Sequence, residues 1–356
     1  AIDAKSPYTG GHCQRVPELT KMLAAAACES DNEPFRDFVL DEEQWYELHL
    51  AGWLHDCGKV TTPEYVVDKS TKLETIYDRI HEVRNRFEIL IKEAEIEYLK
   101  ARVEANGDGD KLEAEFKARV EQIKDDYAFI AESNLGGEFF DDEKVERIKQ
   151  ISAQTWTRNL DRSIGLSWEE GKRLEEDPLA PAPAVESVLA DRGDHLTGQY
   201  NLGEVYNLSI ARGTLTEEER QKINSHISVT IEMLESLPFP KHLAKVTEYA
   251  GGHHEKMDGT GYPRGLKKED MSLPARMMAI ADIFEALTAS DRPYKKAKKL
   301  SEAVKILSFM NKDAHIDSDL FKLFLTAGIW KQYADRFLDP EQIDDIDVSE
   351  YLKDLD

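Results

Sequence analysis

The sequence predicts an all-α fold, a helical bundle interrupted by a long inserted antiparallel helical hairpin. Apolar residues recur at helical spacing along most of the chain, and we find no convincing strand pattern. The turn sequence NGDGD at 106–110 separates two apolar seams of comparable length. This pattern is typical of two antiparallel helices joined by a short loop. We therefore expect helices and no strands.

The composition is that of a folded protein with a sizeable core. Of the 356 residues, 41% are hydrophobic and 33% are charged, which allows one large domain or two ordinary ones. The net charge of −24 repels nucleic acid, so we expect no DNA partner. A phosphate-bearing substrate would need local positive charge, such as metal ions. No apolar run approaches the roughly 20 residues that span a bilayer, so we expect no membrane span.

The cysteines and the first residue bear on the setting of the chain. Cys13, Cys28 and Cys57 form an odd set without CxxC spacing, which predicts reduced thiols and a cytoplasmic location. The chain begins with Ala1, and the first motif follows almost at once. We expect a catalytic fragment of a longer protein, with a processed natural start as the alternative.

The first predicted elements are a buried helix and the hairpin. LHLAGWLHDCGKV at 48–60 reads as the end of a buried helix, and Gly58 supports a helix end there. The hairpin follows over 74–132 and carries one apolar seam on each helix. The first seam consists of Ile76, Ile80, Val83, Phe87, Leu90 and Ala94. The second consists of Leu112, Phe116, Val120, Ile123, Tyr127 and Ile130.

The middle of the chain is predicted to be helical and then extended. Residues 141–176 are polar, and Trp156 and Trp168 are the expected packing anchors. The stretch DPLAPAPA at 177–184 holds three prolines in eight residues and cannot be helical throughout. We expect it to be a linker or an extended strap.

Helical periodicity returns from residue 214. Thr216 followed by Glu219 is a capping signal at the start of a helix. MSLPARMMAIADIFEALTA at 271–289 predicts a compact, largely buried helix. The acidic tail over 339–356 is expected to be a solvated end, with a role in binding a partner as the alternative.

Seven side chains are candidate metal ligands. His253 and His254 are adjacent imidazoles, which are costly to bury without a shared partner such as a metal ion. Asp282 is an acid in an otherwise apolar stretch and needs a cation or several donors. The full set is His12, His55, Asp56, His226, His253, His254 and Asp282. Five imidazoles and two carboxylates exceed one tetrahedral zinc site and suit two divalent ions, of the iron or manganese type or of other metals.

Three sequence blocks resemble the HD-GYP phosphodiesterases, an all-helical branch of the HD metal-dependent phosphohydrolases that hydrolyses cyclic dinucleotides. They are HDCGK at 55–59, HHEKMDGTGYPRGL at 253–266 and ADIFEALTASDRPY at 281–294. The resemblance covers roughly 6–73 and 212–327. It implies an HD-type helical bundle and divides the chain into three parts: an HD-GYP catalytic domain over 1–73 and 212–327, a helical insertion over 74–211, and an acidic C-terminal extension over 328–356.

The resemblance also implies roles for single residues. Those implied to hold the first metal are His12, His55, Asp56 and Asp282. Those implied to hold the second are Asp56, as a bridge, and His226, His253 and His254. Those implied to contact the substrate are Lys59, Gly261, Tyr262, Pro263, Arg292 and Lys295. Asp56 and Lys59 are the implied catalytic residues.

Three positions qualify this assignment. Some family members use a glutamate four residues before the first histidine for a third metal, and Tyr8 stands there, so we expect two metals. The separation of His55 from His226 is much longer than in the family, which is why an insertion is expected. His81 lies in a segment that faintly echoes the one around His226, and we favour His226 as the ligand.

The resemblance implies hydrolysis of a cyclic dinucleotide, cyclic di-GMP or 3′,3′-cyclic GMP-AMP, to a linear dinucleotide and in turn to mononucleotides. The implied nucleophile is a hydroxide that bridges the two metals. Two alternatives stay open: an HD phosphohydrolase that acts on another nucleotide, and a catalytically silent cyclic-dinucleotide receptor. The insertion could shape the substrate pocket, form a homodimer interface or contact a sensor domain.

Overall fold

The computed structural model separates into two compact units. The described residues are 7–104, 109–137, 139–176, 180–191, 201–290, 297–353 and 355. Unit 1 comprises Ala1–Asp68 and Gln221–Asp356, and unit 2 comprises Lys69–Arg220. The fold is mostly helical, as predicted. Among the described residues, no helix is both long and apolar enough to cross a membrane.

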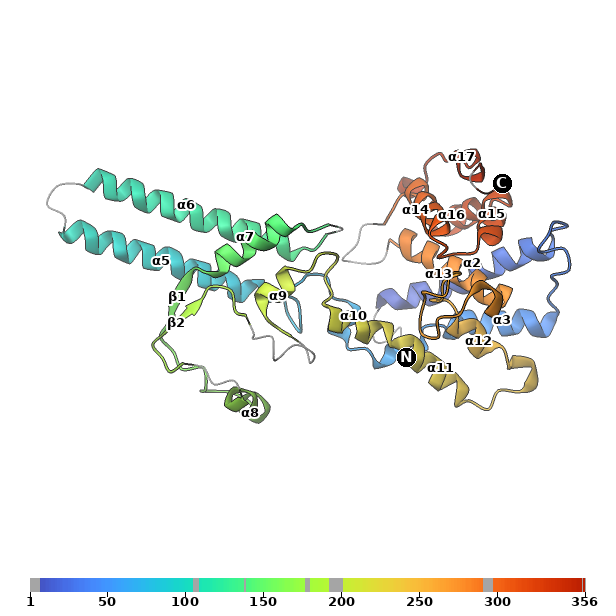
Figure 1. The fold of residues 1–356 in the computed structure, drawn as a ribbon, viewed down its shortest axis with the longest axis horizontal. Coiled ribbons are helices and arrows are strands. Elements are labelled where there is room, and N and C mark those ends of the chain that lie inside the picture. Colours follow the sequence, from blue (N-terminus) through green and yellow to red (C-terminus); the bar gives the residue numbers. More distant parts are fainter. Residues whose placement is uncertain are drawn as a thin grey trace. The chain divides into compact units, whose positions relative to one another are not determined.

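Unit 1 is a helical bundle (Figure 1). Before unit 2 in the chain, it contains α2 (Pro7–Cys28), α3 (Glu42–Leu54), the 3-10 turn η1 (Cys57–Thr61) and α4 (Glu64–Val67). After unit 2, it contains α11 (His226–Glu235), η3 (Lys241–Leu243), α12 (Val246–Gly251), η4 (Lys268–Asp270), α13 (Leu273–Thr288), α14 (Leu300–Lys312), α15 (Ser318–Thr326), α16 (Ile329–Phe337), η5 (Pro340–Gln342) and α17 (Ser349–Leu352). Helix α10 (Glu217–Asn224) crosses the boundary between the units.

Helix α13 lies at the centre of unit 1 because it is apolar on nearly every side. Met277, Met278, Ile280 and Phe284 are all fully buried on it, and α2, α12, α14 and α15 pack around it. Helix α2 in turn packs against α3. At this contact Gly52 allows a close approach, because a Cβ there would lie only 3.0 Å from the Cα atom of Pro17. The close packing joins the helices that carry the first predicted ligands.

The C-terminal segment is packed, so the prediction of a solvated tail is wrong. Ile346, Val348, Tyr351 and Leu352 pack against the core of unit 1. The buried side chain of Gln342 donates to the carbonyl oxygen atoms of Thr288 and Lys298, at 2.8 and 3.0 Å. The packing was not evident from the sequence, because the apolar residues of this segment occur singly between acidic residues.

Unit 2 is built around a helical hairpin with smaller elements beside it (Figure 1). Its elements are α5 (Ile80–Glu104), α6 (Gly109–Asn134), α7 (Asp142–Ser152), β1 (Thr155–Arg158), α8 (Trp168–Glu176), β2 (Ala184–Ser187) and α9 (Glu204–Leu208). Helices α5 and α6 pack against each other, as the two apolar seams predicted. The core of unit 2 includes Val83, Phe87 and Leu90 of α5 with Ile123 and Ile130 of α6.

The predicted start of the first seam is wrong. Helix α5 begins at Ile80, and Ile76 precedes it with 96% of its surface exposed. Polar contacts of Asp78 account for the later start. Its carboxylate accepts hydrogen bonds from the Ile80 N–H group and from the Asn134 amide, which fixes a turn before the helix.

Two short strands contradict the expectation of none. β1 and β2 pair antiparallel, with Thr155 opposite Ser187 and Arg158 opposite Ala184. Four residues are too few to show a clear period-two pattern, so no strand signal was visible in the sequence. The expected strap over 177–184 leads into β2, and its residues 177–179 lie outside the described residues.

The two tryptophans expected to anchor the middle of the chain behave differently. Trp156 packs against the core of unit 2 from β1. Trp168 is the first residue of α8 and is 76% exposed, so the prediction is wrong for this residue. A tryptophan alone does not show whether another element covers it.

Candidate metal centre

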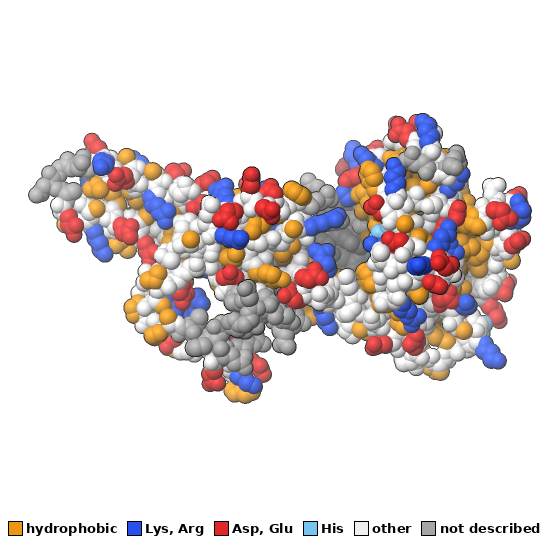
Figure 2. Space-filling model, in the orientation of Figure 1, with side chains coloured by type: hydrophobic (Ala, Val, Ile, Leu, Met, Phe, Trp, Pro, Cys, Tyr) orange, Lys and Arg blue, Asp and Glu red, His pale blue; other side chains and the backbone are white. Residues whose placement is uncertain are grey.

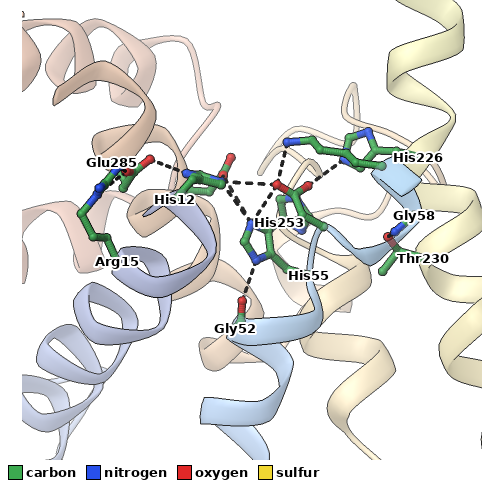
Figure 3. Close-up of polar contacts among 12 residues, drawn as sticks. His12, Arg15, Gly52, His55, Gly58, His226, Thr230, His253 and Glu285 are labelled. Atoms are coloured by element: carbon green, nitrogen blue, oxygen red, sulfur yellow. Dashed lines mark hydrogen bonds and ion pairs between the residues drawn. The ribbon is translucent and has the colours of Figure 1, made fainter. Parts of the chain in front are cut away.

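All seven predicted ligands lie together in unit 1, although they come from five parts of the chain. Figure 3 labels four of them, His12, His55, His226 and His253. His12 lies on α2, His55 and Asp56 join α3 to η1, and His226 begins α11. His253 and His254 follow α12, and Asp282 lies on α13. Their ligand atoms form three overlapping groups, each within 4.8 Å: His226, His253 and His254; His12, His55 and Asp282; His55, Asp56 and His253.

Asp56 lies between the ligand groups and directs one oxygen atom to each side. Its Oδ2 atom is 3.4 Å from Nε2 of both His12 and His55. Its Oδ1 atom is 3.2 Å from Nε2 of His226. On the first side, Nε2 of His12 also lies 3.0 Å from Oδ1 of Asp282. This arrangement suits a carboxylate that bridges two metal ions.

Main-chain contacts orient three of the histidines. The Nδ1 atoms of His55 and His253 contact the carbonyl oxygen atoms of Gly52 and Ala250, at 2.6 and 2.7 Å. His226 makes the same kind of contact with Ile223. In each case the carbonyl group precedes the histidine by three residues, as at a helix end. Nδ1 therefore carries the proton, and Nε2 is left to bind a metal.

Buried atoms without hydrogen-bond partners show that a metal fits this group of residues. Nε2 of His226, Nε2 of His253 and Oδ1 of Asp56 are buried and have no hydrogen-bond partner among the described residues. Leaving three such atoms together would be costly, since buried polar groups are normally satisfied. Imidazole nitrogen and carboxylate oxygen suit divalent iron, manganese and similar ions, so the donor set does not select one metal.

The electrostatic environment keeps His253, His254 and Asp56 in forms that bind metal, whereas the carboxylates beside His55 outweigh its burial and raise its pKa to about 9. Burial lowers the pKa of His253 well below its usual value, and burial lowers the pKa of His254 to about 4. Both imidazoles are therefore neutral near pH 7. Burial alone would raise the pKa of Asp56, but Lys59 and His55 beside it hold that pKa well below its usual range. Asp56 is therefore ionised.

The predicted substrate-contacting cations are only partly described. Lys59 lies beside the bridge, with its Nζ atom 2.6 Å from Oδ2 of Asp56. It is therefore next to the ligand groups, on the side of His12 and His55. Arg292 and Lys295 lie outside the described residues.

The glycine-rich loop packs against the ligand group formed by His226, His253 and His254. The ring of Tyr262 stacks on His254, with ring centroids 4.8 Å apart and planes 20° apart. Gly261 must be glycine, because a Cβ atom there would lie 2.4 Å from the main-chain nitrogen of Lys256. Pro263 follows Tyr262 through a cis peptide bond. The loop thus presents an aromatic ring beside a candidate metal ligand.

Sequence reasoning missed several residues that hold this centre together. Glu285 is fully buried and contacts His12, and Arg15 contacts Glu285. The Gly58 N–H group donates to the hydroxyl group of Thr230 at 2.9 Å. The buried carboxylate of Glu255 accepts hydrogen bonds within the glycine-rich loop. The one available signal was that Glu285 follows Asp282 by three residues, which puts both on one face of a helix.

His81, the alternative to His226 in the sequence, is not among the ligand groups. His81 is an exposed residue of α5 in unit 2, where its ring contacts the guanidinium group of Arg84 at 2.9 Å. His226, which the sequence favoured, is buried among the ligand groups.

Comparison with known proteins agrees with these observations. The HD domain family matches residues 197–320, which include His226, His253, His254 and Asp282. A 3′3′-cGAMP-specific phosphodiesterase of Vibrio cholerae is 41% identical over 111 residues, covering 31% of this chain and 23% of that protein. The cyclic di-GMP phosphodiesterase PA4108 of Pseudomonas aeruginosa is 40% identical over 155 residues, covering 43% of this chain and 34% of that protein.

A third relative is similar over a comparable share of the chain. A cyclic di-GMP phosphodiesterase of Thermotoga maritima is 33% identical over 138 residues, covering 39% of this chain and 36% of that protein. The chain therefore matches only about a quarter to a third of the length of these relatives. Taken together, the buried His and Asp groups and these similarities show that the chain contains an HD domain whose homologues are HD-GYP-type cyclic di-GMP and cGAMP phosphodiesterases.

Proposed function

We propose that this chain is a metal-dependent phosphodiesterase that hydrolyses a cyclic dinucleotide, cyclic di-GMP or 3′,3′-cyclic GMP-AMP. The observation that carries the proposal is the position of Asp56, whose two oxygen atoms face histidines of two different ligand groups. A cytoplasmic location forms part of the proposal, because Cys13, Cys28 and Cys57 are all free thiols.

The seven ligands divide between two metal positions in this proposal. His12, His55 and Asp282 would hold one ion, His226, His253 and His254 would hold the other, and Asp56 would serve both. Two bound divalent ions supply Lewis-acid stabilisation of a phosphate group and lower the pKa of water. The side chains of this chain fix where that chemistry happens, since His55, His226 and His253 are buried and their Nδ1 atoms already contact main-chain carbonyl groups.

Other residues recognise the substrate in this proposal. Lys59 approaches the phosphodiester from beside Asp56 and stabilises charge on its oxygen atoms. Tyr262 offers its ring face for contact with a base, and Gly261 and Pro263 shape the loop. Arg292 and Lys295 are proposed as further phosphate contacts. This local recognition is needed because acidic and basic side chains are interspersed over the face of unit 1 drawn in Figure 2.

The test is hydrolysis by metal-reconstituted protein of cyclic di-GMP, 3′,3′-cyclic GMP-AMP and a set of linear and mononucleotide substrates. The wild type is compared with Asp56→Ala, and products are separated by chromatography. We expect turnover of a cyclic dinucleotide to fall by at least about a hundredfold in the variant, because the bridge between the metals is lost.

Glu47→Gln is the matched control, because Glu47 is a buried acid of unit 1 whose contact is with the Lys245 N–H group. It should keep wild-type turnover. Binding of a cyclic dinucleotide without turnover, by protein that holds two metals, would favour a silent receptor. Turnover of other nucleotides alone would favour a different HD phosphohydrolase activity.

A further inference from the structure

One buried acid beside the ligand groups has no place in the mechanism above. Glu285 lies on α13, one helical turn after Asp282, and its side chain is fully buried. Its Oε2 atom contacts Nδ1 of His12. Its Oε1 atom accepts from Arg15, with distances of 2.7 Å to Nε and 2.6 Å to Nη2. Figure 3 shows Arg15, Glu285 and His12 in a row that leads to the centre.

This contact sets His12 apart from three other candidate ligands. Nδ1 of His55, His226 and His253 contacts a main-chain carbonyl group three residues earlier, whereas Nδ1 of His12 contacts a carboxylate. A main-chain carbonyl group is a neutral acceptor that the local helix geometry supplies. The carboxylate of Glu285 is charged, comes from another helix and is held in place by a separate cation. His12 lies in the second turn of α2, where such a carbonyl group is used by the helix itself.

We propose that Glu285 is a positioning residue for His12, and that Arg15 holds its carboxylate in place. The contact with Oε2 occupies Nδ1 and turns Nε2 of His12 towards Asp282 and Asp56, at 3.0 and 3.4 Å. A carboxylate behind a ligating imidazole fixes its tautomer and raises its affinity for a metal. The proposal rests on the metal centre of the proposed function.

The consequence is that the two metal positions differ in charge. The position formed by His12, His55 and Asp282 has the Asp282 carboxylate as a direct ligand. The carboxylate of Glu285 lies behind His12, in contact with its Nδ1 atom. The position formed by His226, His253 and His254 has three imidazoles and no carboxylate of its own. Asp56 serves both. A divalent cation is therefore held more tightly at the first position, and Glu285 contributes to that difference.

The test measures metal binding rather than activity. Metal-free wild type, Glu285→Gln and the control Glu47→Gln are titrated with Mn²⁺ by calorimetry, and retained metal is counted after dialysis. Glutamine keeps the shape and can accept the proton of Nδ1, but it removes the charge. We expect two Mn²⁺ ions in the wild type. In Glu285→Gln, affinity should fall about 10- to 100-fold at one site, while the other site is unchanged.

Two further variants identify the affected site and guard against misfolding. His226→Ala should weaken the other site, so combining it with Glu285→Gln should weaken both. Arg15→Gln leaves the carboxylate in place but removes its holder, and it should cause a smaller loss at the same site as Glu285→Gln. Arg15 is partly exposed, so this substitution changes a side chain outside the core, whereas Glu285→Gln changes one inside it. Thermal unfolding of each metal-free variant checks the fold.

Each outcome decides a different question. Wild-type Mn²⁺ affinities in both Glu285→Gln and Arg15→Gln, in protein that binds two ions, would overturn the role of Glu285 and leave the proposed function standing. Equal weakening of both sites would also overturn it, because it would indicate a structural effect. Fewer than two bound ions in the wild type would overturn the metal centre itself, and the positioning role with it.

Discussion

Gly58 illustrates how one missing side chain positions a metal ligand. It lies in η1, two residues after Asp56, and faces α11. A Cβ atom at this position would lie 2.0 Å from the carbonyl oxygen of His226 and 2.7 Å from the main-chain nitrogen of Thr230. Main-chain atoms cannot move aside as a flexible side chain can. The close approach of η1 to α11 therefore sets the distance between the Asp56 carboxylate and His226.

We expect Gly58→Ala to separate η1 from α11 and to pull Asp56 away from His226. The added methyl group should lower Mn²⁺ affinity at the second position by at least about tenfold, because bridging needs both oxygen atoms within reach. Calorimetric titration measures this effect. Gly109→Ala is the matched control, since a Cβ atom at Gly109 would meet nothing within 4 Å. Two unchanged sites in Gly58→Ala would contradict the argument.

At the residue scale, the sequence identified the ligands better than their supports. An acid inside an apolar helix and two adjacent imidazoles are unusual enough to be noticed one at a time. All seven candidate ligands lie together in the structure. Their roles as ligands stay predictions. Glu285 and Thr230 could not be assigned, because their significance lies in a partner from a distant part of the chain. Helical spacing gives the face of a residue but not the element opposite.

At the scale of the elements, the shape of the glycine-rich loop depends on Glu255 as well as on its glycines. The carboxylate of Glu255 is fully buried and accepts from the N–H groups of Arg264 and Leu266, at 2.8 and 2.9 Å. The Tyr262 N–H group donates to the His254 carbonyl group at 3.2 Å. These contacts fold the loop back on its own start, so that the ring of Tyr262 reaches His254.

We expect Glu255→Gln to loosen this loop without removing metal. Glutamine offers one oxygen atom instead of two, so one loop N–H group loses its acceptor, which costs about 1–3 kcal/mol. The KM for the cyclic dinucleotide should rise about tenfold while kcat changes little, because Tyr262 is proposed to contact a base. Steady-state kinetics and metal counts measure both effects. Glu269→Gln, at an exposed position after the loop, is the control. A fall in kcat with KM unchanged would contradict a recognition role.

Element prediction succeeded where a long pattern was available and failed where packing decided. The hairpin was predicted because many turns of α5 and α6 repeat the same spacing. The two strands are each four residues long, and their pairing joins segments that are distant in sequence. The C-terminal segment looked solvated because its charge is obvious, whereas its burial depends on single apolar residues such as Val348 and Leu352.

On the scale of the whole molecule, unit 2 is tied together where the chain enters and leaves it. Lys69 is the first residue of unit 2, and its buried Nζ atom lies 2.9 and 2.8 Å from the two carboxylate oxygen atoms of Glu219. The hydroxyl group of Thr214 donates to the carbonyl group of Lys69 at 3.0 Å. The entering and leaving segments are therefore neighbours, as expected for a unit inserted into another fold.

Removing only the Lys69 charge of this ion pair should destabilise unit 2 more than removing both charges. Lys69→Met leaves the buried charge of Glu219 without its cation, which costs about 3–5 kcal/mol. The double variant with Glu219→Gln should recover most of that loss, and glutamine can still accept from the Thr216 N–H group. Hydrogen exchange of unit 2 peptides measures the effect, with peptides of α13 as the internal control. Equal exchange in the single and double variants would contradict the prediction.

The position of unit 2 in the chain also sets the order in which the ribosome delivers the metal ligands. His12, His55 and Asp56 are made before unit 2, and the other four are made after it. All residues of unit 2 have been synthesised by the time His226 is added, whereas the early ligands still lack their later partners. None of the three ligand groups is complete at that stage, because each needs a histidine or an acid from beyond residue 220. A nascent chain therefore cannot assemble the proposed metal centre until α13 has been synthesised.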